Sequence, residues 1–272
     1  MKLQREAVGH GLPIEEKFGY AGALQVGDTI HVAGQLARDS GGKQVPGPLA
    51  TKLGVAYGNI GSLLAKLGVA LDRVFQAQIH VDVSLSENLE VIRAVSARHL
   101  RLADVALTVV QVTGLNDADG MVEISAMAGA ARKQDKDKMA QNPEIRSNSV
   151  VHSYAARIGA ADVVVHGDII YVAGQLPLDA SGKLLCPGDI AGQFGAALDA
   201  VDRALRSVDS SISRVLALDI FTSQPLSAES FDSFCSAHRE RMSEYRPTGT
   251  MVRVAQLPLE GALVYISAIA AR

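Results

Sequence analysis

One carboxylate of the chain lies inside an otherwise apolar run. Glu123 is the one charged residue of MVEISAM, residues 121–127. A carboxylate among apolar neighbours needs a polar partner or takes a raised pKa, and both environments are typical of groups that transfer protons in catalysis. The alternative is a solvent-facing residue on an edge strand. The pattern therefore makes Glu123 a candidate general acid or base, with the structural alternative left open.

Other residues are candidates for ligand binding. Arg253 alternates with Val252 and Val254, which fits either an anion-binding arginine or an exposed arginine on a strand. Gln35 and Gln175 both end an Ala-Gly-Gln triplet. Each amide either contacts a ligand or holds the adjoining loop in place. Because both triplets are identical, a shared structural role remains an alternative for the two glutamines.

The chain lacks the spacings that mark metal, phosphate or serine-nucleophile chemistry. Cys186 and Cys235 are far apart with no CxxC, as expected of reduced thiols. His80, His99 and His238 follow no metal-ligand spacing, which favours surface or internally satisfied histidines. No G-x-S-x-G or phosphate-cradling loop is present. We expect neither a metal nor a cofactor.

Composition limits the classes of protein further. The 272 residues are 48% hydrophobic and carry a net charge of −3, from 26 basic and 29 acidic residues. A nucleic-acid-binding protein would need a basic surface, so this class is disfavoured. No apolar run reaches the ~18 residues of a membrane span. The first residues lack a signal-peptide pattern. These features predict a cytoplasmic protein.

The strongest pattern is an internal repeat. GDTIHVAGQLARDSGGK (27–43) and GDIIYVAGQLPLDASGK (167–183) are identical at 11 of 17 positions. Later blocks correspond as well, and the polar stretch between the copies contains Pro143. The sequence therefore predicts two tandem domains. The expected ranges are 1–132 for the first domain, 133–149 for a polar linker and 150–272 for the second domain.

Each copy has the same predicted order of elements. Strands alternate with two amphipathic helices, of which the second in the first copy has Ser86 as its expected N-cap. This order predicts an α+β domain with both helices on one face of a sheet. The other face is apolar enough to need cover from domain pairing or oligomerisation. The expected strands are 29–33, 74–83, 107–112, 122–127, 168–173, 214–222, 250–255 and 262–269, and the expected helices span about 53–67, 190–206 and 228–242.

The repeated blocks resemble a known family. G-D-x-I-x-V-A-G-Q-L-x-x-D-x-x-G-K, the later R-V-x-x-x-x-I and the terminal L-V-Y-I-S-A-I-A resemble the RidA/YjgF family over nearly the whole chain. The resemblance implies a chorismate-mutase-like α+β fold, assembly into a trimer and small-molecule clefts between neighbouring domains. It also implies hydrolysis of reactive imines and enamines, such as 2-iminopropanoate, to a ketone and ammonia without a cofactor.

The resemblance assigns some substrate-binding positions. The family's carboxylate-binding arginine falls on Leu107 in the first copy and on Gly249 in the second. Neither residue can make the bidentate contact of a guanidinium with a carboxylate. Main-chain amides near Gly34 and Val109 are expected to meet a ligand oxygen, because backbone donors do not depend on the side chain.

The resemblance also assigns catalytic positions, and these survive in one copy. The family's water-positioning glutamate corresponds to Glu123, and its N-terminal tyrosine corresponds to Tyr20. The second copy has Tyr265 and Ala160 at these two positions. The first copy is therefore the candidate site, and the second copy is degenerate.

Three functions remain open from the sequence. The first is a cofactor-independent hydrolase, deaminase or tautomerase that acts on a small imine or enamine. The second is a non-catalytic small-molecule-binding or scaffold protein. The third is a chorismatase-like hydrolase, since that group also joins related domains in tandem. Ammonia release from a panel of imines separates the first function from the second.

Overall fold

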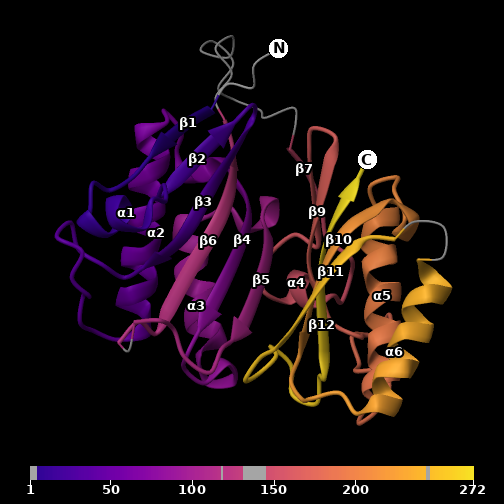
Figure 1. The fold of residues 1–272 in the computed structure, drawn as a ribbon. Helices are drawn as coiled ribbons and strands as arrows, with labels where there is room; N and C mark the ends of the chain where they lie inside the picture. Colours follow the sequence, from indigo (N-terminus) through magenta and orange to yellow (C-terminus); the bar gives the residue numbers. More distant parts are fainter. Residues whose placement is uncertain (1–4, 118, 131–144, 243–245) are drawn as a thin grey trace.

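Two similar halves lie side by side, and each contains one sheet backed by two long helices (Figure 1). The structure is a computed structural model. Within the residues that it describes, no helix has the length and apolar character that a membrane crossing requires. The described residues are 5–117, 119–130, 145–242 and 246–272.

The first copy is a six-stranded mixed sheet in the order β1-β2-β3-β6-β4-β5. Its strands pair antiparallel, except for the parallel pair β4–β5. Helices α2 and α3 pack together on one face, and the short helix α1 follows the first strand. The elements are β1 (Arg5–Val8), α1 (Pro13–Phe18), β2 (Ala23–Val26), β3 (Thr29–Leu36), α2 (Leu49–Lys66), β4 (Val74–Val81), α3 (Leu85–His99), β5 (Ala106–Gln111) and β6 (Val122–Gly129).

The second copy repeats this plan in the order β11-β10-β12-β9-β8-β7, with β10–β11 as its parallel pair. Residues 145–148, which the sequence assigned to the linker, form the first of its strands; most of that predicted linker lies outside the described residues. The elements are β7 (Ile145–Asn148), α4 (Tyr154–Arg157), β8 (Val163–His166), β9 (Ile169–Gln175), α5 (Ile190–Arg206), β10 (Val215–Thr222), α6 (Ala228–Arg241), β11 (Thr248–Arg253) and β12 (Val264–Ala271).

The predicted α+β fold with two helices on one sheet face is confirmed in both copies. One local expectation is wrong: α3 begins at Leu85 with Ser84 at its N-cap, so Ser86 lies in the first turn. The sequence also gave no sign of α1 and α4, because helices this short have too few residues to show a period.

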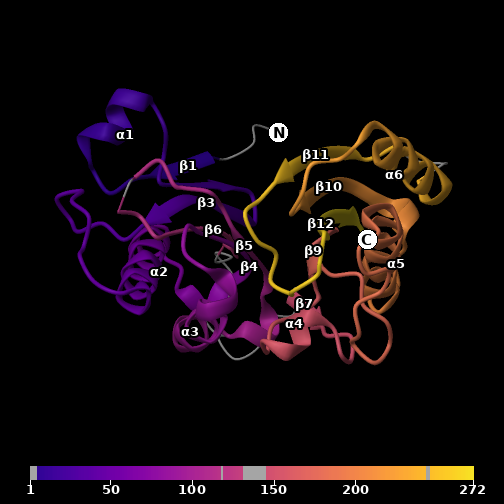
Figure 2. The same cartoon turned by 90° about the horizontal axis from the view of Figure 1, so that it is seen from below.

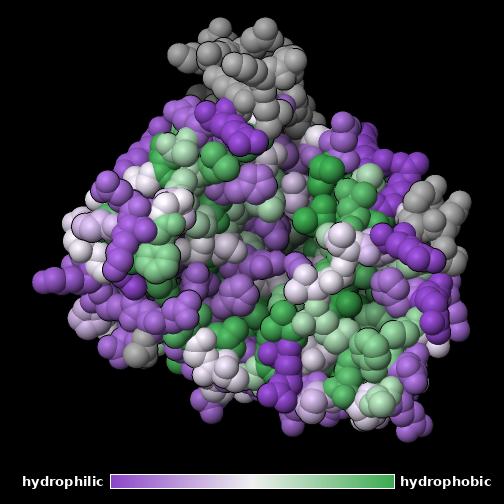
Figure 3. Space-filling view, in the orientation of Figure 1, coloured by the Kyte–Doolittle hydropathy of each residue, from purple (hydrophilic) through white to green (hydrophobic). Residues whose placement is uncertain are grey.

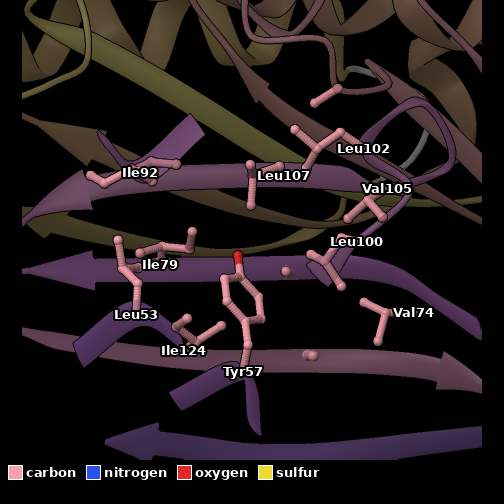
Figure 4. Close-up of a cluster of buried hydrophobic side chains, with 14 of the residues drawn as sticks. Leu53, Tyr57, Val74, Ile79, Ile92, Leu100, Leu102, Val105, Leu107 and Ile124 are labelled. Atoms are coloured by element: carbon pink, nitrogen blue, oxygen red, sulfur yellow. The ribbon is translucent and has the colours of Figure 1, made fainter. Parts of the chain in front are cut away.

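The core of the first copy lies between its sheet and its helices. Tyr57 of α2 is buried at the centre of this core and points across β4 and β6 (Figure 4). Its hydroxyl is 2.7 Å from Ser96 Oγ on α3, which satisfies the buried polar atom. Burial raises the pKa of Tyr57 well above its ordinary value. The hydrogen bond therefore joins the two helices through a neutral phenol.

The two sheets turn their helix-free faces toward each other, with the helices outside (Figure 2). Among the strands of the two copies, β5 of the first and β9 of the second make the most extensive contact. Thr108 Oγ1 accepts a hydrogen bond of 3.0 Å from the Gly174 amide, and Phe75 stacks on His166 with 4.5 Å between ring centroids. Domain pairing, one of the two predicted covers, thus buries a part of the apolar faces.

The strand that corresponds to β5 in the second copy is left bare. Every residue of β11 is exposed, including Met251 and Val252, whereas Ala106–Val110 of β5 are all buried. Figure 3 shows hydrophobic side chains gathered near the boundary of the two copies and over the second copy, amid a mostly hydrophilic surface. The same strand is therefore an internal contact in one copy and a free sheet edge in the other.

Candidate functional site

Glu123 lies on β6 with its side chain on the helix-free face of the first sheet. Its neighbours Val122 and Ile124 are buried in the core, and Glu123 itself is half-buried. The carboxylate lies over Gly34 of β3: an ideal Cβ at Gly34 would stand 1.8 Å from Glu123 Oε1. A side chain at position 34 would displace the carboxylate, so this glycine is what leaves room for Glu123.

A cavity of about 270 Å³ opens beside Gly34. Its lining comes from β3, α2 and the segment around α1. The lining includes three of the residues expected from the sequence, Tyr20, Gly34 and Gln35. Tyr20 is 47% exposed, so its ring is at the open side. The structure thus brings Tyr20, Gly34 and Gln35 to one cavity. Glu123 is not among the lining residues: its carboxylate lies over Gly34 on the helix-free face of the sheet.

A chain of hydrogen bonds fixes the inner wall of this cavity. Gln35 donates through Nε2 to the Ala33 carbonyl at 3.0 Å, and its Oε1 is 2.9 Å from His10 Nε2. Glu15 is buried and accepts from the amides of His10, Gly11 and Leu12. The Gln35 amide thus holds its own loop and also lines the cavity.

Glu15 is an ionised group of this wall. Burial alone raises the pKa of its carboxyl, but the main-chain donors of residues 10–12 and the charge of His10 together lower the pKa below its ordinary value. Ionised Glu15 therefore contributes stability above its unfolded pKa, and this contribution is lost as the pH falls through the lowered value. Its role is to hold the turn before α1, which places His10 beside Gln35.

Arg38 also lines the cavity but is already paired. Its guanidinium donates to Asp117 Oδ2 at 2.7 Å and to the Gly42 carbonyl at 3.1 Å. The Gln44 amide and the Arg38 cation lower the pKa of Asp117 against the effect of its burial. Since the lining also contains Glu15 and Asp39, the cavity has no excess of positive charge.

The corresponding place in the second copy is filled by a tyrosine. Tyr265 is fully buried, and an ideal Cβ at Gly174 would stand 1.9 Å from its Cζ. Burial raises the pKa of Tyr265 well above its ordinary value, and the neighbouring Tyr154 acts in the same direction. The ring also packs edge-on against Tyr154, with 6.2 Å between centroids. This aromatic side chain thus closes the contact between the copies.

A buried carboxylate, that of Asp162, lies near Tyr265. Asp162 accepts from the Val150 amide at 2.7 Å, the Ser153 hydroxyl at 2.6 Å and the Gln175 amide at 3.0 Å. Burial raises its pKa, although these three donors act against the rise. Asp162 satisfies buried donors of its own copy. In the second copy, the Ala-Gly-Gln glutamine is therefore a structural residue.

Three residues expected at the site lie elsewhere. Leu107 and Val109 are buried on β5, with Val109 near Tyr265 of the second copy. Arg253 is exposed at the end of β11. None of the three lines the cavity of the first copy. Leu107 and Gly249 do occupy equivalent places, since they pair with Ala77 and Leu218 at the same register of the two sheets.

Three residues near the site were not expected there. His10 and Glu15 line the cavity, and His80 of β4 stands directly across from Glu123 in the antiparallel register. The position of His10 between two glycines was the one available signal. His80 gave none, because strand register depends on contacts between segments far apart in the chain. In the described part of the chain, no group of His, Cys, Asp and Glu side chains could hold a metal ion.

Comparison with known proteins gives matches to each copy. A family model described as Endoribonuclease L-PSP matches residues 14–130 and again residues 152–272. A RutC family protein of Sulfurisphaera tokodaii is 28% identical over 106 residues, covering 39% of this chain and 82% of that protein. Protein HMF1 of Saccharomyces cerevisiae is 30% identical over 104 residues, covering 38% of this chain and 77% of that protein.

One solved structure is similar over both copies. The crystal structure of a chorismatase covers 92% of this chain and 77% of its own, with a TM-score of 0.62 and 16% sequence identity. At this identity the similarity concerns the fold alone. It shows that the tandem arrangement of two such domains also occurs in another solved protein.

Proposed function

Because the chain belongs to the endoribonuclease L-PSP family, the RidA/YjgF group, we propose that it is a cofactor-independent hydrolase of small reactive imines or enamines. The observation that carries this proposal is the half-buried carboxylate of Glu123 over Gly34, a glycine that also lines the cavity with Tyr20 and Gln35. A half-buried carboxylate is suited to take a proton from a water and to return it.

The proposed reaction uses one water and no other reactant. Glu123 accepts a proton from the water as its oxygen adds to the carbon of the C=N bond. The protonated carboxyl then gives this proton to the nitrogen, which forms a carbinolamine. Glu123 next takes the proton of the new hydroxyl group and passes it to the nitrogen as the C–N bond breaks, so that a carbonyl compound and ammonia leave. Tyr20 orients the water or the substrate through its hydroxyl. Tautomerisation of an enamine uses the same carboxylate to move a proton from nitrogen to carbon.

The substrate is not expected to present a carboxylate in the manner of a 2-imino acid. The arginine positions of the family hold Leu107 and Gly249, and the arginine of the cavity, Arg38, is engaged by Asp117. A substrate that is neutral at this end fits such a lining better, since an unpaired anion would lie close to Glu15 and Asp39.

Ammonia release from a panel of imines generated in solution tests this function. We expect turnover by the native chain, and a loss of about 100-fold or more in kcat/KM for Glu123→Gln, the size of effect of a general acid or base. Glu16→Gln is the matched control, because Glu16 is an exposed carboxylate of the same copy. Equal turnover by Glu123→Gln and the native chain would contradict the mechanism.

A second candidate is a non-catalytic binding protein. The filled site of the second copy and the missing arginines favour it, because both remove parts of the family's chemistry. Ligand binding at the first-copy cavity without ammonia release would support this alternative. The cavity does not support the chorismatase-like alternative or the ribonuclease activity that the name of the family model suggests. A cyclic diacid substrate or an RNA backbone needs unpaired cations at the site.

We also infer that copies of the chain associate, and a trimer remains our prediction. The bare β11, with Met251 and Val252 exposed, supports association, because its counterpart β5 is covered within the chain. Val252→Asp should reduce the mass measured by light scattering, and Val252→Thr should not. A single-chain mass for the native protein would contradict association.

A further inference from the structure

His80 and Glu123 are partners across two neighbouring strands. They face each other in the antiparallel register of β4 and β6, where directly opposed side chains have Cβ atoms about 4.5–5.5 Å apart. Both residues are half-buried. On the side of β3, the Glu123 carboxylate lies over Gly34, which has no side chain to displace it. The imidazole thus stands beside the group on which the proposed function depends.

The second copy supplies a natural comparison for this pair. Phe221 and Tyr265 are paired at the same register of β10 and β12, with 6.3 Å between their ring centroids. Both aromatic residues are buried in the contact between the copies. The second copy therefore has two aromatic rings at these positions, whereas the first copy has an imidazole and a carboxylate.

The strands on either side of His80 place one charged residue opposite it, Glu123. On the other side of β4, the residue paired with His80 is Val110 of β5, which is apolar and buried. Along the chain, Gln78 of β4 and Asp82, the residue after the end of β4, flank His80 at alternate positions. Burial lowers the pKa of His80, and the charge of Glu123 acts against this fall. The described surroundings thus place the carboxylate of Glu123 directly opposite the imidazole and that of Asp82 two residues along the chain.

We propose that His80 is a positioning residue for Glu123: the imidazole holds the carboxylate over Gly34 and favours its ionised form. This role rests on the proposed function, in which Glu123 takes a proton from water. When His80 carries a proton, its positive charge favours the carboxylate; when it is neutral, its ring N–H remains a hydrogen-bond donor. A phenylalanine at this place, as in the second copy, supplies neither.

The first test is the pH dependence of kcat/KM for His80→Phe, which introduces the residue of the second copy. We expect the acid limb to move to higher pH, because the variant removes the positive charge that the imidazole places beside the carboxylate when it is protonated. His31→Phe is the matched control, since His31 is an exposed histidine on β3, the strand on the other side of β6 from β4. An acid limb that stays in place for His80→Phe would overturn the positioning role.

The second test needs no turnover. Titration of the His80 ring by NMR, assigned by its disappearance in His80→Phe, compares the native chain with Glu123→Gln. We expect a lower pKa of His80 in Glu123→Gln, because the charge that raises it is gone. Equal titration curves would overturn the pairing. If the native chain releases no ammonia, the proposed function fails, and the titration still decides whether the imidazole and the carboxylate are coupled.

Discussion

The two copies place chemically opposite residues at the same position of one fold. Position 123 of the first copy is a half-buried carboxylate, and the equivalent Tyr265 is a fully buried ring in the contact between the copies. Both lie over the glycine of an Ala-Gly-Gln triplet. In each copy the glycine leaves a space that a residue of the facing strand fills. In the first copy this residue is the carboxylate of Glu123, which is available for chemistry, and in the second it is the ring of Tyr265, which packs.

The neighbouring strand explains why the two positions diverge. Tyr265 belongs to the same apolar cluster as Leu107 and Val109 of β5, so an aromatic side chain buries apolar surface there. Nothing in the described part of the chain packs in the same way against Glu123. A carboxylate tolerates this half-buried place, because it keeps access to water and to His80.

The largest expected effect of a change at these equivalent positions is on stability. Tyr265→Ala should lower the free energy of unfolding by about 3–5 kcal/mol, because it leaves a cavity between the copies. Glu123→Ala should change it by less than about 1 kcal/mol, as for a partly exposed residue. Urea unfolding of both variants measures the difference. Tyr265→Phe is the control and should cost little, since the hydroxyl has no hydrogen-bond partner among the described residues. Similar losses for the two alanine variants would break the comparison.

The glycines beneath these residues sharpen the comparison. Gly174→Ala should destabilise by about 1–3 kcal/mol, because a methyl group would meet the buried ring of Tyr265, which has no space to move. Gly34→Ala should cost less, since the far end of the Glu123 side chain can swing away. Its effect should instead appear in ammonia release, because the carboxylate is displaced. Thermal unfolding measures the stability losses of both variants, and an activity assay measures their ammonia release. A larger stability loss for Gly34→Ala than for Gly174→Ala would contradict this account.

The smallest expected effect concerns two threonines at equivalent positions of the two copies, Thr108 of β5 and Thr250 of β11. Thr108→Val should cost about 1–2 kcal/mol, because it leaves the buried Gly174 amide without an acceptor. Thr250→Val should leave the unfolding free energy of the single chain nearly unchanged, since Thr250 is exposed on β11. Chemical unfolding at low protein concentration measures both. A loss for Thr250→Val as large as that for Thr108→Val would indicate that β11 is covered in solution.

Much of the fold was predictable from local sequence. The predicted helix 190–206 agrees with α5, and the predicted strand 214–222 begins one residue before β10, because apolar periodicity is strong in both. The candidate site was predictable in part. Glu123, Tyr20 and Gln35 came from their types and from the family pattern, whereas Leu107, Val109 and Arg253 lie away from the cavity.

The sequence by itself determined that there are two copies, that each is an α+β unit and that the first copy keeps the carboxylate. These features follow from identity between segments and from side-chain period, which are local properties. Tertiary structure alone decided that Tyr265 is buried by β5 and that His80 stands opposite Glu123. Burial and strand register depend on which distant segments pack together, and no short stretch of sequence contains that information.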